Sequence, residues 1–270
     1  MNIALPAALV IAAGLVLSAP ATAQTQPRKR TSTPQLAAFP EGRDRLPERY
    51  EGVDSRKVLS VLKKGVASLK KRKTESDEQF KARAADAEKV LRPISMKATY
   101  AFRVPGLAAQ YSAHRQAYVF GGRSGYGCPA SGFLDGYVTC VVGDYPVVNA
   151  EDGGSKGAAK ARREALGLAV RIESGMIGSS FALDRNTFYF KQELPVPAET
   201  AQRLKDHQIS VLFVGNVVGE RFVDDSGKVV LPIVKNRSDS TTLEYDLPFT
   251  VSKVVFYVYQ TGEILKEMEF

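Results

Sequence analysis

Residues 116–142 have the sequence QAYVF (116–120), GGRSGYGC (121–128), PASGFLD (129–135) and GYVTCVV (136–142). Both ends of this stretch are rich in aromatic and β-branched residues, which favour strands. Six glycines lie between Gly121 and Gly136, a composition that is typical of a loop. Long loops in compact domains are usually functional or disordered. The stretch therefore predicts two strands joined by a long glycine-rich loop.

The two cysteines of the chain, Cys128 and Cys140, both lie in this stretch. They are twelve positions apart, and the two histidines, His114 and His207, are distant in sequence, so the spacing does not match a zinc site. Two cysteines allow one internal pairing. In an exported protein we expect a Cys128–Cys140 disulfide, which would contribute about 3 kcal/mol in the chain-entropy model.

Four larger side chains lie among the glycines: Arg123, Tyr126, Phe133 and Tyr137. Aromatic residues and arginine are enriched at recognition surfaces. We therefore treat these four as candidate binding residues for protein or carbohydrate. The alternative is a connection whose aromatic side chains simply cover the sheet. No Gly-Lys-Ser/Thr sequence follows the glycines, so a phosphate-binding loop is not indicated.

The N-terminal residues indicate the compartment. Residues 1–23 carry no charged side chain, and residues 3–17 are nearly all apolar. Ala21 and Ala23 match the A-x-A cleavage pattern, so we expect a signal peptide cleaved after Ala23 and a periplasmic or secreted protein. The alternative is an uncleaved anchor, but the apolar run is marginal for the ~20 residues of a spanning helix.

Positive charge is concentrated near the N-terminus. The formal net charge is +8, and residues 24–75 hold 14 Lys/Arg against 6 Asp/Glu, whereas residues 76–270 hold 23 of each. In an exported protein such a segment suits an anionic membrane surface or a cell-envelope polymer, and nucleic acid is not an expected partner. The alternative is a solvated leader without a partner.

The chain divides into four predicted segments. They are a signal peptide (1–23), a flexible basic and proline-rich linker that contributes nothing to a core (24–50), a helical pair (51–93) and a β-rich domain (94–270), for which a division near residue 190 is left open. Asp54 is suited to cap the first helix, which has apolar residues at helical spacing. Ser76 and Gln79 form a capping box for the second helix.

From Met96 onward the apolar period changes to two, which predicts about ten strands and one short helix near residues 195–205. Ile209–Val218 is expected to be a central strand, Thr241–Asp246 an edge strand and Val251–Tyr259 a separate buried strand. A turn is expected at Tyr145–Pro146. Because the links are short, the sheet should be mainly antiparallel. The predicted fold class is α+β, with a sandwich or strongly bent sheet and an N-terminal two-helix segment.

Catalytic motifs are weakly represented. Neither His114 nor His207 lies in a recognisable triad motif, and no Gly-x-Ser-x-Gly elbow is present. The adjacent Asp224 and Asp225 fit a hairpin turn better than a calcium loop, because no closing Glu follows. We therefore expect no catalytic residue, no metal site and no cofactor.

The leading hypothesis is an exported non-enzymatic protein that binds a protein or cell-envelope component through a disulfide-bonded glycine- and aromatic-rich loop. One alternative is a cell-wall or glycan hydrolase with two carboxylates ~5–9.5 Å apart. Another is a peripheral membrane-surface protein held by a basic amphipathic helix over residues Asp54–Lys73. That helix could equally pack its apolar stripe on its own domain.

Overall fold

The computed structural model describes residues 36, 38–69, 71–84, 87–105, 107, 109–120, 137–147, 163–171, 181–184, 187–205, 207–218, 233–236 and 242–270. All of them belong to one compact unit, Pro34–Phe270. In these residues the protein is α+β and mostly β, as the sequence predicts.

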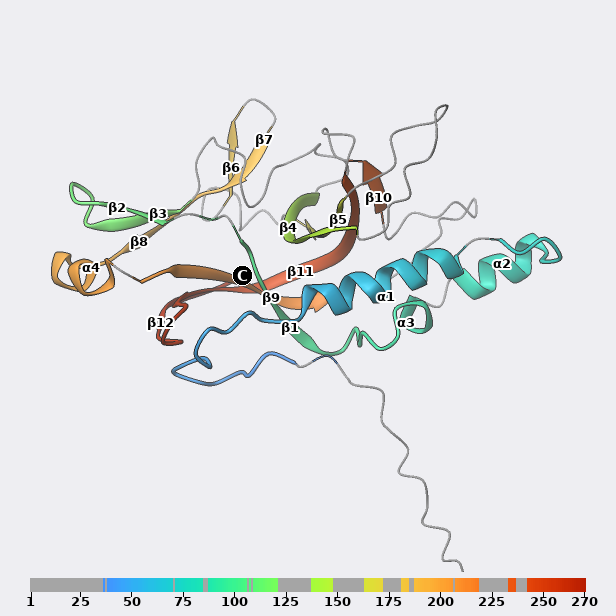
Figure 1. Cartoon of the computed structure of the whole chain (residues 1–270), viewed down its shortest axis with the longest axis horizontal. Helices are drawn as coiled ribbons and strands as arrows, with labels where there is room; N and C mark the ends of the chain where they lie inside the picture. Colours follow the sequence, from blue (N-terminus) through green and yellow to red (C-terminus); the bar gives the residue numbers. More distant parts are fainter. Residues whose placement is uncertain are drawn as a thin grey trace, which may run out of the picture. The chain divides into compact units, whose positions relative to one another are not determined.

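The helices are α1 (Ser55–Ser68), α2 (Asp77–Ala84), α3 (Ala87–Val90) and α4 (Ala198–Leu204) (Figure 1). The strands are β1 (Thr99–Arg103), β2 (Ala109–Ser112), β3 (Ala117–Phe120), β4 (Tyr137–Pro146), β5 (Arg163–Arg171), β6 (Phe181–Asp184), β7 (Thr187–Phe190), β8 (Gln192–Pro195), β9 (Ile209–Val217), β10 (Ile233–Asn236), β11 (Thr242–Val258) and β12 (Ile264–Glu269). The largest sheet has the order β1-β9-β11-β5-β4, and β10 and β12 also pair with β11. Smaller sheets are formed by β2-β3-β8 and by β6-β7.

The largest sheet is mixed. Most of its strand pairs are antiparallel, as predicted, but β5 and β11 run parallel, from the pair Arg163 and Thr242 to the pair Val170 and Phe249. A parallel pair requires a long connection, and here β6 to β10 lie between the two strands in sequence. Local turn signals could not predict this pairing. Because strands before and after residue 190 share this sheet, the chain is not divided between sheets at that point.

Strand β11 corrects two predictions. Residues 241–246 were expected to form an edge strand separate from 251–259, yet β11 is continuous and pairs on both sides. Pro248 lies within it, opposite Ala169 of β5, and its carbonyl accepts a hydrogen bond from Val218 N (3.1 Å). The proline lacks an N–H donor, but its carbonyl still joins the strand to the end of β9.

The turn predicted at Tyr145–Pro146 is also wrong. Both residues belong to β4 and pair with Glu164 and Arg163 of β5. Pro146 ends β4, which lies at the edge of the sheet, and an edge strand tolerates the missing N–H. The extension places the Tyr145 ring beside α1, where it becomes part of a cleft described below.

The largest sheet is buried on both faces. On one face, Phe102, Phe213 and Phe256 belong to the main core, which also includes apolar residues of α1, α2, α4 and the β2-β3-β8 sheet. On the other face, Ala101, Leu212, Val214, Val255 and Tyr257 form a second core. This alternation follows from the side-chain period of two in a strand.

The second face is covered by the segment that precedes α1. Phe39 and Leu46 are buried in the second core at 8% and 3% exposure. The segment is held by backbone hydrogen bonds, Phe39 N to Thr99 O (2.9 Å) and Leu46 N to Gly262 O (2.9 Å). The prediction that residues 24–50 form a flexible linker without core residues is therefore wrong for this part of the segment. The polar and proline-rich composition of this segment predicted a linker, although Phe39 and Leu46 are core residues.

Helix α1 begins as predicted, with the Asp54 side chain accepting hydrogen bonds from the backbone N–H groups of Arg56 and Lys57. Val58 and Leu62 are buried at 1% and 0% exposure, and the helix contacts β4, β5 and β11. The apolar stripe of this basic helix is therefore core, the second of the two roles considered for it. Among the described residues, no helix combines the length and the apolar character needed to cross a bilayer.

The connection from α1 to α2 is fixed by Arg83. Its guanidinium donates to the Glu75 carboxylate (2.7 and 2.8 Å) and to the Ser68 carbonyl at the end of α1. The hydrogen bonds from Arg83, together with one from the backbone N–H of Arg72, lower the pKa of Glu75 to about 2. The predicted capping box is confirmed, because Ser76 N donates to Gln79 Oε1 (3.1 Å) and Gln79 N donates to Ser76 Oγ (3.2 Å).

The close contact between Gly52 and β1 gives a first prediction. Gly52 has φ +74°, and a Cβ at this position would lie 2.3 Å from Ala101 O. Gly42 has a similar φ of +69° but open space around it. We expect Gly42→Ala to lower the free energy of unfolding by about 1 kcal/mol through backbone strain, and Gly52→Ala to lower it by about 2–4 kcal/mol because a steric term is added. Urea denaturation measures both, and equal losses would contradict the close packing of residues 52–53 on β1.

Candidate functional site

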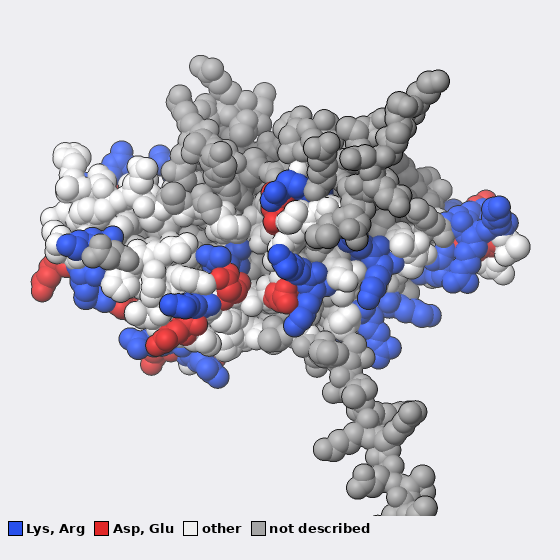
Figure 2. Space-filling model, in the orientation of Figure 1, with Lys and Arg blue, Asp and Glu red and all other residues white. Residues whose placement is uncertain are grey.

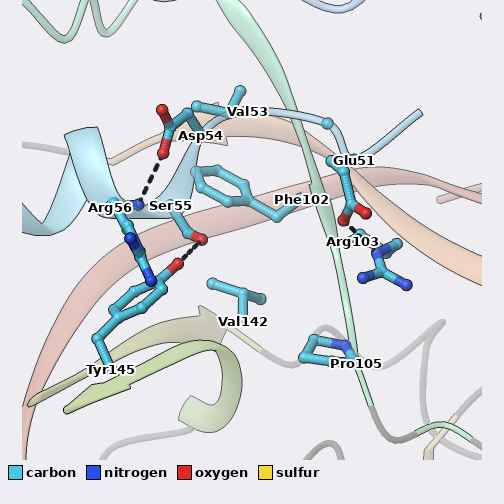
Figure 3. Close-up of a pocket in the computed structure, with 11 residues that line it drawn as sticks. Glu51, Val53, Asp54, Ser55, Arg56, Phe102, Arg103, Pro105, Val142 and Tyr145 are labelled. Atoms are coloured by element: carbon cyan, nitrogen blue, oxygen red, sulfur yellow. Dashed lines mark hydrogen bonds and ion pairs between the residues drawn. The ribbon is translucent and has the colours of Figure 1, made fainter. Parts of the chain in front are cut away.

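A cleft of about 320 Å³ lies where the start of α1 faces β1 and β4 (Figure 3). We call it the α1–β1 cleft, and its lining residues are Glu51, Gly52, Val53, Asp54, Ser55, Arg56, Phe102, Arg103, Pro105, Val142 and Tyr145. They come from the segment before α1, the first turn of α1, β1 and its end, and β4. Its volume is at the lower end of the range typical of small-ligand pockets.

One end of the cleft is formed by Arg103. Its Nε donates to Glu51 Oε2 at 2.6 Å, and its guanidinium lies 4.9 Å from the centre of the Tyr259 ring. The Tyr259 hydroxyl donates to the other oxygen of Glu51, and this hydrogen bond raises the pKa of Tyr259. Arg103 is therefore held in place, and its charge is balanced by Glu51.

The other end is formed by Arg56. Its guanidinium lies 4.7 Å from the centre of the Tyr145 ring, and the Tyr145 hydroxyl shares a hydrogen bond with Ser55 Oγ. The Arg56 side chain is exposed, and in the described part of the chain it has no carboxylate partner. A guanidinium stacked on an aromatic ring keeps its N–H donors free at the edge of the plane. As far as the described residues show, Arg56 is therefore the lining cation that is available to an anion.

The floor between the two arginines is apolar. Phe102 and Val142 lie there, at 2% and 7% exposure (Figure 3). The Phe102 ring meets Phe249 edge to face, with ring centres 5.3 Å apart, so the floor is continuous with the main core. An apolar floor beside a cation that has no carboxylate partner among the described residues suits a ligand that has an anionic group and an apolar face, such as a sugar ring or a peptide side chain.

The cationic surface continues from the cleft along α1. Residues 55–74 hold eight Lys/Arg and no Asp/Glu. Because the apolar side of α1 is buried, its cations face outward, and Figure 2 shows Lys and Arg gathered over the region of α1 and α2. We call Arg56, Lys57, Lys63 and Lys64 the α1 basic face. Lys63 pairs with Glu164 (2.6 Å), whereas Lys64 is exposed without a carboxylate partner among the described residues.

The binding residues predicted from the glycine-rich stretch are not part of this cleft as described. Arg123, Tyr126, Phe133 and Cys128 lie outside the described residues. Tyr137 begins β4, opposite Arg171 of β5, and nothing is described of its side chain. Cys140 lies in β4 opposite Leu168 and is fully buried. The Cys128–Cys140 disulfide stays a prediction.

The two histidines lie in different elements. His114 is exposed in the turn between β2 and β3. His207 follows α4 and lines a second cavity that does not share residues with the α1–β1 cleft. Within the described ranges, no three His, Cys, Asp or Glu side chains are placed to hold a metal ion.

Two buried carboxylates were not predicted. Glu244 and Asp246 are two residues apart on β11, which places them on the same face, at 3% and 1% exposure. Thr139 Oγ1 donates to Asp246 Oδ2 at 3.3 Å, and both carboxylates have further partners in the protein. The sequence signal was the alternation of Thr242, Glu244 and Asp246 with larger apolar residues. Their partners favour a structural role.

Sequence reasoning also missed the cleft. In the sequence, Ser55 and Arg56 simply follow the predicted helix cap at Asp54, and Arg103 belongs to no recognisable motif. The acid-free run at residues 55–74 was the one available signal. The contact of Tyr145 with Ser55 spans ninety positions in the chain, so no local pattern could predict it.

The two arginines of the cleft should differ in their effect on stability. Arg103→Gln removes a partly buried ion pair and the contact with Tyr259, so we expect the free energy of unfolding to fall by about 1–2 kcal/mol. Arg56→Gln should change it by less than about 0.5 kcal/mol, because the side chain is exposed. Chemical denaturation of the two variants measures the difference. A larger loss for Arg56→Gln would mean that Arg56 is structural.

Comparison with known proteins identifies no relative of this chain. No protein-family model matches it, and no curated protein or solved structure shows significant similarity. The function of the cleft must therefore be argued from its own residues.

Proposed function

We propose that this is an exported, non-enzymatic protein that binds an anionic polymer of the cell envelope. The observation that carries the proposal is the continuity of the α1–β1 cleft with the α1 basic face at Arg56. A cation without a described carboxylate partner stands at the edge of an apolar floor, and a row of further cations extends away from it. The signal peptide predicted for residues 1–23 supplies the expected location.

A polymer fits this arrangement better than a single ion. Arg56 and Lys64 are eight residues apart on one helix, a rise of about 12 Å. Repeating anionic groups could contact both cations at once, while a sugar ring or peptide unit between them covers Phe102 and Val142. The affinity for such a polymer rises with each added contact, because one bound anionic group raises the effective concentration of the next group along the polymer.

Catalysis is not favoured by the cleft chemistry. The described lining contains no histidine and no cysteine, and the Ser55 hydroxyl is paired with a tyrosine. A nucleophilic serine requires an adjacent base. The acidic groups of the lining are also engaged, since Glu51 binds Arg103 and Asp54 caps α1. These contacts support binding as the role of the site.

The predicted loop at residues 121–136 remains part of the proposal. We propose that this loop is closed by the Cys128–Cys140 disulfide and makes a second contact with the ligand.

We further propose that the large sheet is strongly bent and that it is not one layer of a sandwich. Two register irregularities support this bend, one between Val251 and Lys253 and one between Phe256 and Tyr257 of β11. Bulges of this kind bend a strand.

The disulfide can be tested by counting thiols. Protein purified from the exported fraction and unfolded without reductant should show no reactive thiol, and it should show both after reduction. Cys128→Ser provides the control, because it should leave Cys140 reactive once the buried strand is unfolded. Two reactive thiols in the unreduced wild-type protein would rule out the disulfide.

Binding can be tested with purified peptidoglycan sacculi, which carry carboxylates, and with phosphatidylglycerol vesicles. We expect salt-sensitive binding to sacculi. Arg56→Gln should weaken it about tenfold. Lys57→Gln/Lys64→Gln should weaken it about three- to tenfold, and the charge-matched control Lys97→Gln/Lys191→Gln by less than about twofold.

Three outcomes would contradict the polymer proposal. Equal losses in the two double variants would indicate a response to net charge alone. Binding to the vesicles but not to sacculi would indicate a membrane surface as the partner. Binding to neither sacculi nor vesicles would mean that the α1 basic face is not a recognition surface for such anionic partners.

A further inference from the structure

The Arg103 end of the α1–β1 cleft has hydrogen-bond donors that its own ion pair does not use. Arg103 donates to Glu51 through Nε alone, and in the described part of the chain no acceptor is assigned to its terminal nitrogens, Nη1 and Nη2. Figure 3 shows these two nitrogens pointing away from Glu51, on the side of Pro105. The Arg103 side chain lines the cleft and is 22% exposed, so part of it is open to a ligand.

The Arg103 guanidinium is held on two sides. It lies 4.9 Å from the centre of the Tyr259 ring, and the Tyr259 hydroxyl donates to the second oxygen of the Glu51 carboxylate that pairs with Arg103. A guanidinium stacked on a ring keeps its remaining N–H donors at the edge of its plane. Because the side chain is already ordered, a ligand that binds these donors does not have to immobilise it.

Glu51 determines which kind of acceptor suits these donors. An anion bound to Nη1 or Nη2 would lie close to the Glu51 carboxylate, and repulsion between the two negative charges would offset the attraction of the guanidinium. A neutral carbonyl oxygen accepts the same hydrogen bonds without that repulsion. The Arg103 end of the cleft therefore favours a neutral acceptor, whereas Arg56, which has no carboxylate partner among the described residues, favours an anion.

The surface between the two arginines is suited to the body of such a ligand. Pro105 is exposed at the Arg103 end, and Phe102 and Val142 form the floor beyond it (Figure 3). A carbonyl group bound by Arg103 brings its neighbouring carbon atoms onto these apolar groups. The flat face of a sugar ring covers the floor and separates the neutral acceptor from the anionic group.

We infer that the α1–β1 cleft recognises an acidic sugar unit that also carries a neutral N-acyl group. The acyl carbonyl accepts hydrogen bonds from the terminal nitrogens of Arg103, its methyl group packs on Pro105, and the anionic group binds Arg56. This inference rests on the proposed binding of an anionic envelope polymer and specifies the repeating unit of that polymer. Binding through net charge alone would require no acyl group.

The inference is tested by measuring, with NMR titration, the affinity of the protein for three fragments. They are N-acetylmuramate, which has both groups, its analogue with a hydroxyl in place of the acetamido group, and N-acetylglucosamine, which lacks the carboxylate. We expect N-acetylmuramate to bind about fivefold more tightly than either of the others. Arg103→Gln should remove the preference over the hydroxyl analogue only, and Arg56→Gln the preference over N-acetylglucosamine only. The control Lys97→Gln/Lys191→Gln should retain both preferences.

Glu51→Gln provides a second test that keeps Arg103 in the cleft. An analogue with a carboxylate in place of the acetamido group should bind the wild-type protein about fivefold more weakly than N-acetylmuramate, because Glu51 repels it. In Glu51→Gln this difference should disappear or reverse. A purely structural Glu51 would leave the relative affinities of the two fragments unchanged, and that result would contradict the inference.

The inference and the polymer proposal can fail separately. Equal binding of N-acetylmuramate and its hydroxyl analogue, or no binding of either, would overturn recognition of the acyl group, while Arg56-dependent binding to sacculi would still support the polymer. An acyl preference without binding to sacculi would support the assignment of the cleft and contradict the polymer. N-acetylalanine bound as tightly as N-acetylmuramate would overturn the assignment to a sugar.

Discussion

The burial of both faces of β9 and β11 is the constraint on which the rest of the structure depends. Successive residues of these strands alternate between two cores, so neither face can be left to solvent. The larger core is covered by α1, α2, α4 and the β2-β3-β8 sheet. The smaller core needs a separate cover, and the segment from Phe39 to Leu46 supplies it. Its polar groups are held by backbone hydrogen bonds, as buried backbone groups require.

This cover also creates the candidate site. After crossing the second face, the chain returns to the exposed edge of β1, where Gly52 pairs with Phe102 and Val53 N donates to Ala101 O (2.7 Å). Asp54 follows immediately and caps α1. The same few residues therefore protect a sheet edge, begin the helix and line the cleft. Because the helix is capped at a fixed point, Arg56 reaches the Tyr145 ring on β4.

The sequence predicted many of the local elements and few of their contacts. The cap at Asp54, the capping box at Ser76, the central strand β9 and the short helix α4 all follow from residue types within a few positions of each other. The parallel pairing of β5 with β11 and the continuity of β11 through Pro248 do not, because they depend on strands that lie far away in the chain. The linker prediction was wrong for a related reason. Apolar residues spaced too widely for a strand or helix pattern contribute to a core only when a second surface is present.

The cleft shows the same difference between local features, which the sequence predicted, and long-range contacts, which it did not. Eight cations without an acidic residue at positions 55–74 could be counted in the sequence, and they predicted a basic helix. Whether that helix would turn its apolar side to a membrane or to its own domain depended on the sheet, and the structure places that side in the core. The sequence by itself determined the α+β class, the alternation that makes the sheet two-faced and the charge of α1, because each is a property of neighbouring residues. Only the tertiary structure decided that Glu51 balances the charge of Arg103, whereas Arg56 has no carboxylate partner in the described part of the chain. The reason is that ion pairing depends on distances between residues that are far apart in sequence.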